Sequence, residues 1–348
     1  MNRRPSALLS VLLVGLAAAG CTRQIVPDRG PTAYYQTAYP AHDTSQDLER
    51  VLEAVRRIEV TSVYETYRFS ENDAPTAGET LDESVLSRAV ESTSTVQTRS
   101  ATAVVVSRSG REILMLTASH AVHFPDTVVQ YFDRGRPDDR VEAPLRRIRS
   151  VSILRRRSNW VMGLPPMDPF EVLAEDRPRD LAFLGTRYPE DADPREVPTF
   201  PLPTGSSDRL SWGSFVYAVG YPSGYPMVTR GVVSSPGGEL PGGFVIDGLW
   251  NEGMSGGPVL AVRGETDGLE WVGMARSSAA ATEHRLGPAE GVVEDHDPWR
   301  PYEGPLFIEE IRRIQYGIML AVPINAVRDF MEEHRRELQR LGYDPPEL

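Results

Sequence analysis

Three short motifs, far apart in this 348-residue sequence, contain the side chains that nucleophilic catalysis needs. Residues 253–258 read Gly-Met-Ser-Gly-Gly-Pro, His120 ends the run Leu-Thr-Ala-Ser-His, and Asp180 begins the run Asp-Leu-Ala-Phe-Leu. Serine is a poor nucleophile at neutral pH, and histidine is suited to remove its proton because it titrates near that pH. An aspartate then orients the imidazole and stabilises the cation that forms. The motifs predict Ser255 as nucleophile, His120 as base and Asp180 as the residue that orients His120.

The glycines around Ser255 predict a site for the negative charge that develops on a carbonyl oxygen during attack. Such an oxyanion needs two convergent N–H groups, and the loss of one donor typically costs about 3 kcal/mol of transition-state stabilisation. The backbone amides of Gly253 and Ser255 are placed in the motif to supply them. Gly256 and Gly257 allow a substrate to approach the backbone closely.

The serine motif has one rival interpretation among enzymes. Gly-x-Ser-x-Gly around Ser255 also matches the nucleophile elbow of α/β-hydrolase esterases, with Asp295 or Asp297 and His334 available downstream. That elbow requires a strand, a sharp turn and then a helix. Residues 258–262 read as another strand, which disfavours the esterase hypothesis.

The elements that must position these residues are short strands. From residue 98 onward, β-prone runs alternate with turns rich in glycine and proline, which predicts antiparallel sheets closed as a sandwich or barrel. Before residue 98, helices are predicted at 45–58 and 81–90 and a strand at 60–69. Within the β-rich part, we expect a junction between two halves at about 185–210 and a long polar loop at 277–316, and a last helix is predicted at 324–341.

The N-terminus predicts export. Arg3 and Arg4 precede an apolar run at residues 8–19 that is short for a membrane span, and small residues follow it, as in a signal peptide. Residues 1–20 end directly before Cys21, which resembles a bacterial lipoprotein cleavage site and predicts lipidation of Cys21. Residues 21–44 lack periodicity and predict a flexible tether.

Composition excludes several other classes. The net charge is −12, all 37 basic residues are arginine, and no basic patch interleaved with aromatics indicates nucleic-acid binding. Because Cys21 is the single cysteine, the folded part has no internal disulfide. His120 and His123 form an H-x-x-H pair, but no glutamate stands at the spacing typical of zinc sites, so no metal and no cofactor are predicted.

Taken together, the motifs resemble those of trypsin-like serine peptidases, and particularly the HtrA/Deg branch. The histidine signature Thr-Ala-x-His, the aspartate signature and Gly-x-Ser-Gly-Gly-Pro match in the family's order, and the runs at 220–234 and 319–325 resemble its flanking segments. The similarity covers about residues 98–335. It implies a mainly β fold of two six-stranded antiparallel barrels (chymotrypsin-like) with N-terminal helices and a C-terminal helix, and a serine endopeptidase that cleaves polypeptides through an acyl-enzyme.

Two departures from the family pattern limit how the enzyme is expected to work. Met254 stands where an Asn or Asp is usual, so activation by pairing with a freshly cut N-terminus is not expected. No PDZ-type domain is expected after the closing helix. By analogy the specificity pocket lacks a carboxylate, which predicts an apolar residue before the cleaved bond; its expected residues are Leu249, Trp250, Gly273, Met274, Ala275 and Arg276.

The predicted organisation is a signal peptide at 1–20, a tether at 21–44, an extension at 45–97, a protease domain at 98–341 and a tail at 342–348. The expected location is the bacterial cell envelope, on a membrane through a lipid at Cys21. The expected role is cleavage of exported or envelope polypeptides, including protein quality control. A second hypothesis, a catalytically silent binding or chaperone-like lipoprotein, stays open because a sequence does not reveal loop order.

Overall fold

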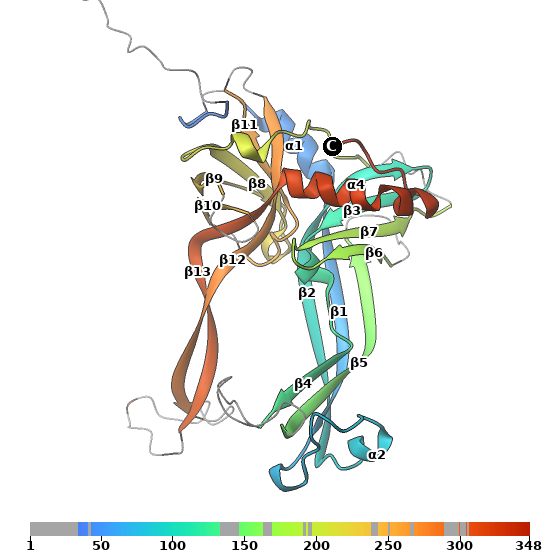
Figure 1. Ribbon diagram of the computed structural model, residues 1–348. Coiled ribbons are helices and arrows are strands. Elements are labelled where there is room, and N and C mark those ends of the chain that lie inside the picture. Colours follow the sequence, from blue (N-terminus) through green and yellow to red (C-terminus); the bar gives the residue numbers. More distant parts are fainter. Residues whose placement is uncertain are drawn as a thin grey trace, which may run out of the picture. The chain divides into compact units, whose positions relative to one another are not determined.

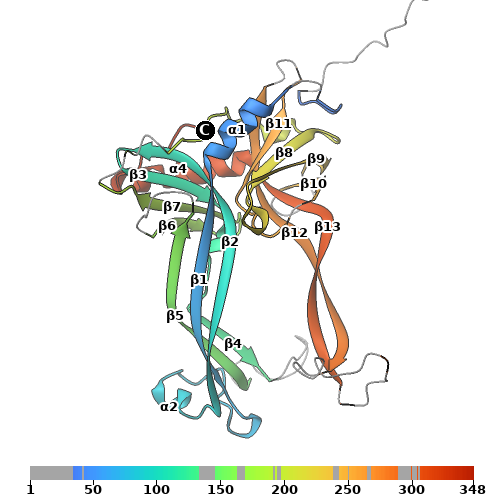
Figure 2. The same cartoon turned by 180° about the vertical axis from the view of Figure 1, so that it is seen from behind.

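Strands dominate the architecture, and the predicted mainly β class is confirmed (Figure 1; Figure 2). The computed structural model describes residues 34–40, 43–132, 146–162, 169–190, 193, 197–237, 243–249, 251–264, 268–288, 299, 304 and 306–348. All of these lie in one unit, Ala33–Leu348. The predicted signal peptide, Cys21 and most of the predicted tether lie outside the described residues.

One sheet is a closed six-stranded antiparallel barrel with the strand order β10-β13-β12-β11-β8-β9. This agrees with the barrel predicted for the second half of the chain. Its strands are β8 (Phe215–Gly220), β9 (Met227–Ser235), β10 (Phe244–Gly248), β11 (Pro258–Val262), β12 (Leu269–Pro288) and β13 (Leu306–Pro323).

The other sheet has seven antiparallel strands in the order β4-β5-β1-β2-β3-β7-β6. It differs from the predicted second six-stranded barrel, because β4 and β6 end the order and no pairing between them closes the described part of the sheet. β4 pairs with residues 148–153 of β5, in the outer region where β1, β2 and β5 run on together. The strands are β1 (Val55–Arg68), β2 (Glu91–Ser109), β3 (Glu112–Thr117), β4 (Thr127–Tyr131), β5 (Ile148–Val161), β6 (Glu171–Asp176) and β7 (Leu181–Arg187).

We call the outer part of this sheet the arm: residues 58–68 of β1, 91–100 of β2, 148–157 of β5, and β4. Figure 1 shows it extending away from the rest of the sheet towards the short helix α2. Residues 91–98 of β2 are exposed, whereas 101–107 are buried. A small apolar cluster that includes Phe69, Ile148 and Val151 stabilises the far end of the arm.

A shared apolar core lies between the sheet and the barrel. Alternate residues of each strand point to opposite faces, so Leu114 and Leu116 of β3 enter the shared core while Ile113 and Met115 enter the interior of the sheet. The same alternation occurs in the apolar runs of β2, β7 and β11, whose two faces are both buried. The helix α4 (Ile324–Arg340) covers this core, and Phe330 stacks on Phe183 with ring centroids 4.6 Å apart.

The N-terminal helices are shorter than predicted. The expected helix at 45–58 ends early, as α1 (Ser45–Glu53), and Val55 already begins β1 by pairing with Val104. Pairing with β2 overrides the helical spacing of the apolar residues. The expected helix at 81–90 is the single turn α2 (Glu83–Leu86), capped by Asp82. The C-terminal helix agrees with the prediction and ends before Gly342, at a φ of 93°.

The predicted polar loop at 277–316 is wrong. β12 and β13 continue through it as a two-stranded ribbon, paired from Gly273 and Pro323 out to Pro288 and Leu306. Backbone hydrogen bonds between the two strands satisfy polar groups that a loop would leave to water. Sequence polarity alone therefore did not separate a two-stranded ribbon from a loop.

The last part of the predicted tether is anchored on the barrel rather than free. Tyr35 is fully buried, and its hydroxyl donates to Glu270 Oε2 at 3.0 Å and accepts from the amide of Ser206 at 3.0 Å. Burial beside Glu270 raises the pKa of Tyr35 well above its ordinary value. Tyr34 lies against the guanidinium groups of Arg209 and Arg263. A segment without periodicity can thus be ordered by two aromatic side chains.

Candidate active site

The two sheets bring the three predicted catalytic residues together. β3 and β7 are antiparallel neighbours, with Thr117 opposite Ala182, so the end of β3 lies beside the start of β7. His120 follows β3 in the single-turn helix α3 (Ser119–Val122), and Asp180 immediately precedes β7. The barrel supplies Ser255, in the loop between β10 and β11.

The side chains form a continuous hydrogen-bonded relay. His120 Nδ1 lies 2.8 Å from Asp180 Oδ2 and 3.1 Å from Oδ1, and His120 Nε2 lies 3.0 Å from Ser255 Oγ. The backbone amide of His120 also donates to Asp180 Oδ1, at 2.9 Å. The geometry lets the imidazole take the hydroxyl proton of Ser255 while its other nitrogen stays bonded to the carboxylate.

Exposure changes along the relay from the carboxylate to the imidazole. The side chain of Asp180 is 7% exposed and that of His120 is 45% exposed. Asp180 adopts a φ of 60°, which is uncommon for a residue with a Cβ although Asp tolerates it better than most. Its carbonyl accepts from the amide of Ser119 at 3.2 Å, and these backbone contacts hold the buried carboxylate under the exposed histidine.

The glycines of the serine loop are required by its backbone. Gly253 has a φ of 104° and Gly256 a φ of 89°, a region that favours glycine. A Cβ on Gly256 would lie 2.0 Å from the carbonyl oxygen of Thr102, and one on Gly253 would lie 2.3 Å from that of Tyr221. The motif is therefore needed both for loop shape and for close packing.

Thr102 of β2 joins the sheet to the serine loop, and the sequence analysis missed it. Its amide donates to the carbonyl of Ser255 at 2.8 Å, and its hydroxyl donates to the carbonyl of Gly253 at 2.6 Å. The same hydroxyl accepts from the amide of Tyr221 at 3.0 Å, and Thr117 Oγ1 donates to the Thr102 carbonyl at 2.7 Å. The one available signal was a lone polar residue inside the apolar run 101–106.

The side chain of Met254, the residue before Ser255, is buried in an apolar environment. The residue is 1% exposed and packs into the interior of the barrel. A thioether placed there anchors the loop by apolar contact rather than by an ion pair. Within the described residues, neither the Gly253 amide nor the Ser255 amide donates to a backbone carbonyl.

The residues predicted to form a specificity pocket differ in their exposure. Leu249 is 66% exposed, whereas Met274 and Ala275 are fully buried in apolar cores, because alternate positions of β12 face opposite sides of the barrel wall. Gly273 packs closely against the ring of Phe244. Trp250 lies outside the described residues. The expectation of an apolar residue before the cleaved bond stays a prediction.

Arg276, the sixth predicted pocket residue, contacts two residues of the triad, Asp180 and Ser255. Its Nε lies 3.3 Å from Asp180 Oδ2, and its main-chain oxygen accepts from Ser255 Oγ at 2.9 Å. The arginine and aspartate side chains are mostly buried. No signal in the sequence connected Arg276 with Asp180, because 96 positions separate them.

The esterase hypothesis needs a helix after the serine loop, and Asp295 and Asp297, its candidate acids, lie outside the described residues. The serine loop leads into β11, a strand, and His334 lies on α4 with Nδ1 3.0 Å from the carbonyl of Phe330, so the esterase hypothesis fails. His123 Nδ1 contacts Glu175 at 2.9 Å. Over the described ranges, no group of three or more His, Cys, Asp or Glu could hold a metal ion, and no helix is both long and apolar enough to cross a membrane.

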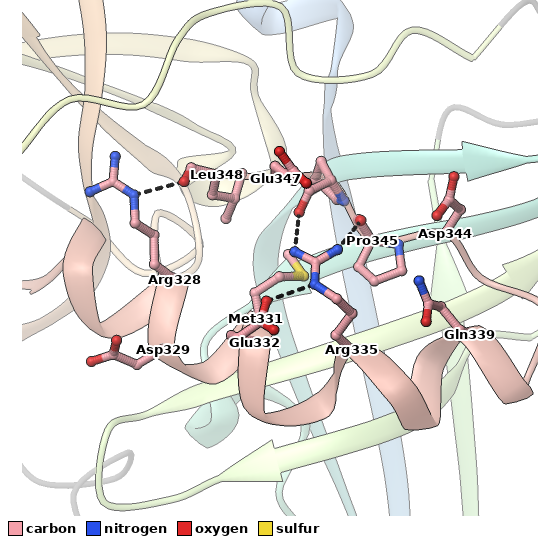
Figure 3. Close-up of a pocket in the computed structure, with 11 residues that line it drawn as sticks. Arg328, Asp329, Met331, Glu332, Arg335, Gln339, Asp344, Pro345, Glu347 and Leu348 are labelled. Atoms are coloured by element: carbon pink, nitrogen blue, oxygen red, sulfur yellow. Dashed lines mark hydrogen bonds and ion pairs between the residues drawn. The ribbon is translucent and has the colours of Figure 1, made fainter.

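A polar cavity of about 760 Å³ lies between α4 and the segment that follows it (Figure 3). Arg335 crosses it and donates to the carbonyls of Pro345 and Pro346, and Arg328 donates to the carbonyl of Leu348 at 2.9 Å. None of the triad residues lines this cavity. Its arginines are used in holding the chain against α4.

Comparison with known proteins identifies the domain that carries the site. Residues 101–269 match the family model of the trypsin-like peptidase domain. A probable periplasmic serine endoprotease, DegP-like, from Pseudomonas putida is 37% identical over 105 residues, and one from Pseudomonas fulva is 35% identical over 112 residues. These matches cover 28% and 29% of this chain, and 20% and 23% of those relatives' own length.

The solved structures that the chain is similar to share less of its sequence. The HtrA-type protease AlgW with a tripeptide is 15% identical, with a TM-score of 0.42 over 84% of this chain and 64% of that one. A serine endoprotease from Yersinia pestis is 17% identical, with a TM-score of 0.39 over 86% of this chain and 69% of that one.

Proposed function

This chain contains an HtrA-like, trypsin-type peptidase domain, which the family model matches over residues 101–269, and on that premise we propose that the protein is a serine endopeptidase of the cell envelope. The observation that carries the proposal is the relay in which His120 Nε2 lies 3.0 Å from Ser255 Oγ and Nδ1 lies 2.8 Å from Asp180 Oδ2. These distances suit proton transfer to the imidazole once the single hydroxyl proton of Ser255 turns from the main-chain oxygen of Arg276 towards His120 Nε2.

The reaction follows from those roles. Ser255 Oγ attacks the carbonyl carbon of a peptide bond as His120 takes its proton, and the carbonyl oxygen becomes an oxyanion. The amides of Gly253 and Ser255 bind that oxyanion. When the intermediate collapses, His120 returns the proton to the leaving amine and an acyl-enzyme on Ser255 remains. Water activated by His120 then releases the acid product. Asp180 keeps the imidazole oriented through both steps.

A fluorophosphonate probe tests this function directly. We expect it to label the wild-type protein at Ser255 and not the Ser255→Ala variant, and we expect the protein lacking residues 1–21 to digest casein. The truncation removes nothing from the unit Ala33–Leu348. Folded wild-type protein that neither reacts with the probe nor digests casein would favour the catalytically silent, binding or chaperone-like lipoprotein.

The envelope location and the lipid anchor are part of the proposal. They are supported by the apolar run at residues 8–19, by the small residues before Cys21, and by relatives whose names describe them as periplasmic. Cells that express the full chain should incorporate labelled palmitate into it, and Cys21→Ser should abolish the incorporation. Incorporation that survives the substitution would refute the anchor at Cys21 without touching the catalytic assignment.

The substrates that we propose are exported or envelope polypeptides, with a role in their quality control. The support is the family of the domain and the names of the relatives, which describe periplasmic serine endoproteases. Comparison of the envelope proteins that accumulate in cells with Ser255→Ala and with wild type would identify the substrates. If the two sets coincide under conditions that unfold proteins, the quality-control role is wrong.

A further inference from the structure

Arg276 is joined to both ends of the triad. Its main-chain oxygen accepts from Ser255 Oγ at 2.9 Å, and its side-chain Nε lies 3.3 Å from Asp180 Oδ2. The side chain of Arg276 is 24% exposed and that of Asp180 is 7% exposed. Screening by salt and water is weak for a pair that is buried to this extent.

Arg276 contacts the same oxygen of Asp180 that His120 does. Oδ2 of Asp180 is also the oxygen that lies 2.8 Å from Nδ1 of His120. A guanidinium keeps its positive charge over the whole working range of a peptidase. The carboxylate that must stabilise a protonated imidazole is therefore already paired with a cation, and two cations that share one carboxylate disfavour each other.

We propose that Arg276 is a positioning residue that orients Asp180 and opposes the protonation of His120, so that the peptidase retains its activity to lower pH than the triad alone would allow. This inference rests on the proposed function for its consequence in catalysis. It concerns a side chain that lies beside the triad and does not contact the reacting atoms, although its main chain does contact Ser255 Oγ.

Other charged groups lie on or beside the elements packed against α3. Arg99 of β2 donates to the main-chain carbonyl of His120, Glu175 of β6 bonds to Ser119 and His123, and Asp176 of β6 bonds to Arg179. All of these groups are unchanged when Arg276 is replaced. A difference between the wild type and an Arg276 variant therefore reports the charge of Arg276 itself.

The pH dependence of kcat/KM for a peptide substrate tests the proposal. Protonation of His120 removes the base, so activity falls on the acidic side of the profile. Without the opposing charge the imidazole holds its proton more easily, and we expect Arg276→Gln to move the midpoint of the acidic limb upward by about 0.5 to 1 pH unit. Arg276→Lys, which keeps a positive charge, should return the midpoint at least halfway to the wild-type value.

Arg179→Gln is the matched control. It removes the same charge one position away from Asp180, but the guanidinium of Arg179 is paired with Asp176 and Glu333. The midpoint of this control should stay within about 0.2 pH unit of wild type, because its charge is already compensated. A merely structural role for Arg276 would lower the plateau of kcat/KM and leave the midpoint in place, which would overturn the proposal.

A second measurement separates this inference from the proposed function. In a Ser255→Ala background, which has no turnover, the ring protons of His120 can be titrated by NMR with and without Arg276→Gln, and assigned with His120→Gln. We expect the same upward movement of the midpoint. If the midpoints with and without Arg276→Gln coincide, the proposed role of Arg276 is overturned. If the wild type shows no turnover, the proposed peptidase function is contradicted, and this titration still tests the role of Arg276.

Discussion

The barrel and the seven-stranded sheet both contribute to the site, but they differ in how their strands are covered. The residues of β11 and the inner part of β2 next to the site are buried on both faces, whereas the arm of the sheet exposes residues 91–98 of the same strand β2. Thr102 marks the change along β2, directly beside Ser255. The comparison shows that the site lies where strands of the barrel and of the sheet are buried on both faces. The exposed part of the arm lies outside that buried region.

The largest expected effect concerns the division of the triad between the two sheets. Ser255→Ala on the barrel and His120→Ala on the sheet should each lower kcat/KM by about 10⁴-fold or more, and the double variant should be no worse, because the residues act as a unit. Peptide hydrolysis by purified variants with unchanged thermal unfolding measures this. Losses that multiply in the double variant would contradict a single relay.

The second effect compares a tryptophan of the shared core with one on the sheet's surface. Trp271 is fully buried, donates to the carbonyl of Gly273 at 2.7 Å and packs on Phe200. Trp271→Ala should lower the free energy of unfolding by about 3 to 5 kcal/mol. Trp160→Ala, at an exposed position of β5, should cost about 0.5 kcal/mol or less. Denaturant unfolding measures both, and equal costs would show that the buried core is not what distinguishes these regions.

The third effect tests whether the serine loop depends on its contact with β2. Gly256→Ala would place a Cβ 2.0 Å from the carbonyl oxygen of Thr102, so we expect a loss of kcat/KM of about 100-fold as the loop shifts. Gly110→Ala is the control: its φ of 59° is also positive, but a Cβ there meets nothing within 4 Å. That variant should lose about 1 kcal/mol of stability and keep its activity. An active Gly256→Ala variant would show that the loop tolerates a different backbone.

The fourth effect concerns the Thr102 hydroxyl. Thr102→Val leaves the carbonyl of Gly253 and the amide of Tyr221 without this partner in a buried place, which should cost about 1 to 3 kcal/mol of stability. Thr102→Ser keeps the hydroxyl and should retain most of it. On the arm, Thr98→Val removes an exposed contact with Thr61 and should change stability by about 0.5 kcal/mol or less. Similar losses at positions 98 and 102 would remove the distinction between the arm and the inner strand.

The smallest effect lies in acid, where Arg179 links the turn before β7 to α4. Burial by itself would raise the pKa of Asp176, but hydrogen bonds from the backbone and side chain of Arg179 outweigh it and lower that pKa; a hydrogen bond from Arg179 lowers the pKa of Glu333. Lowered values mean that the stabilisation is present above the unfolded-state pKa values, near pH 4, and is lost as the pH falls through the folded ones. The melting temperature of Arg179→Gln should therefore lie below wild type at pH 7 and converge with it below about pH 3. A gap that persists in acid would contradict this.

The sequence predicted most residues of the candidate site, because few types of side chain and backbone can perform these roles. Only a few side chains can act as nucleophile, base and orienting acid, and Gly253 and Gly256 are needed because a Cβ does not fit their backbone. The predicted triad residues lie within hydrogen-bonding distance of one another. The pocket was harder, since which face of β12 is open depends on register rather than on residue type.

The sequence by itself determined the mainly β class, the triad and the C-terminal helix, because local periodicity, turn residues and catalytic chemistry are written in short segments. Only the tertiary structure decided that Arg276 pairs with Asp180, that Thr102 holds the serine loop, that Tyr35 docks on the barrel and that residues 280–288 pair with 306–314. Each of these depends on contacts between distant segments. Their formation is governed by strand register and burial, which no single segment of the sequence encodes.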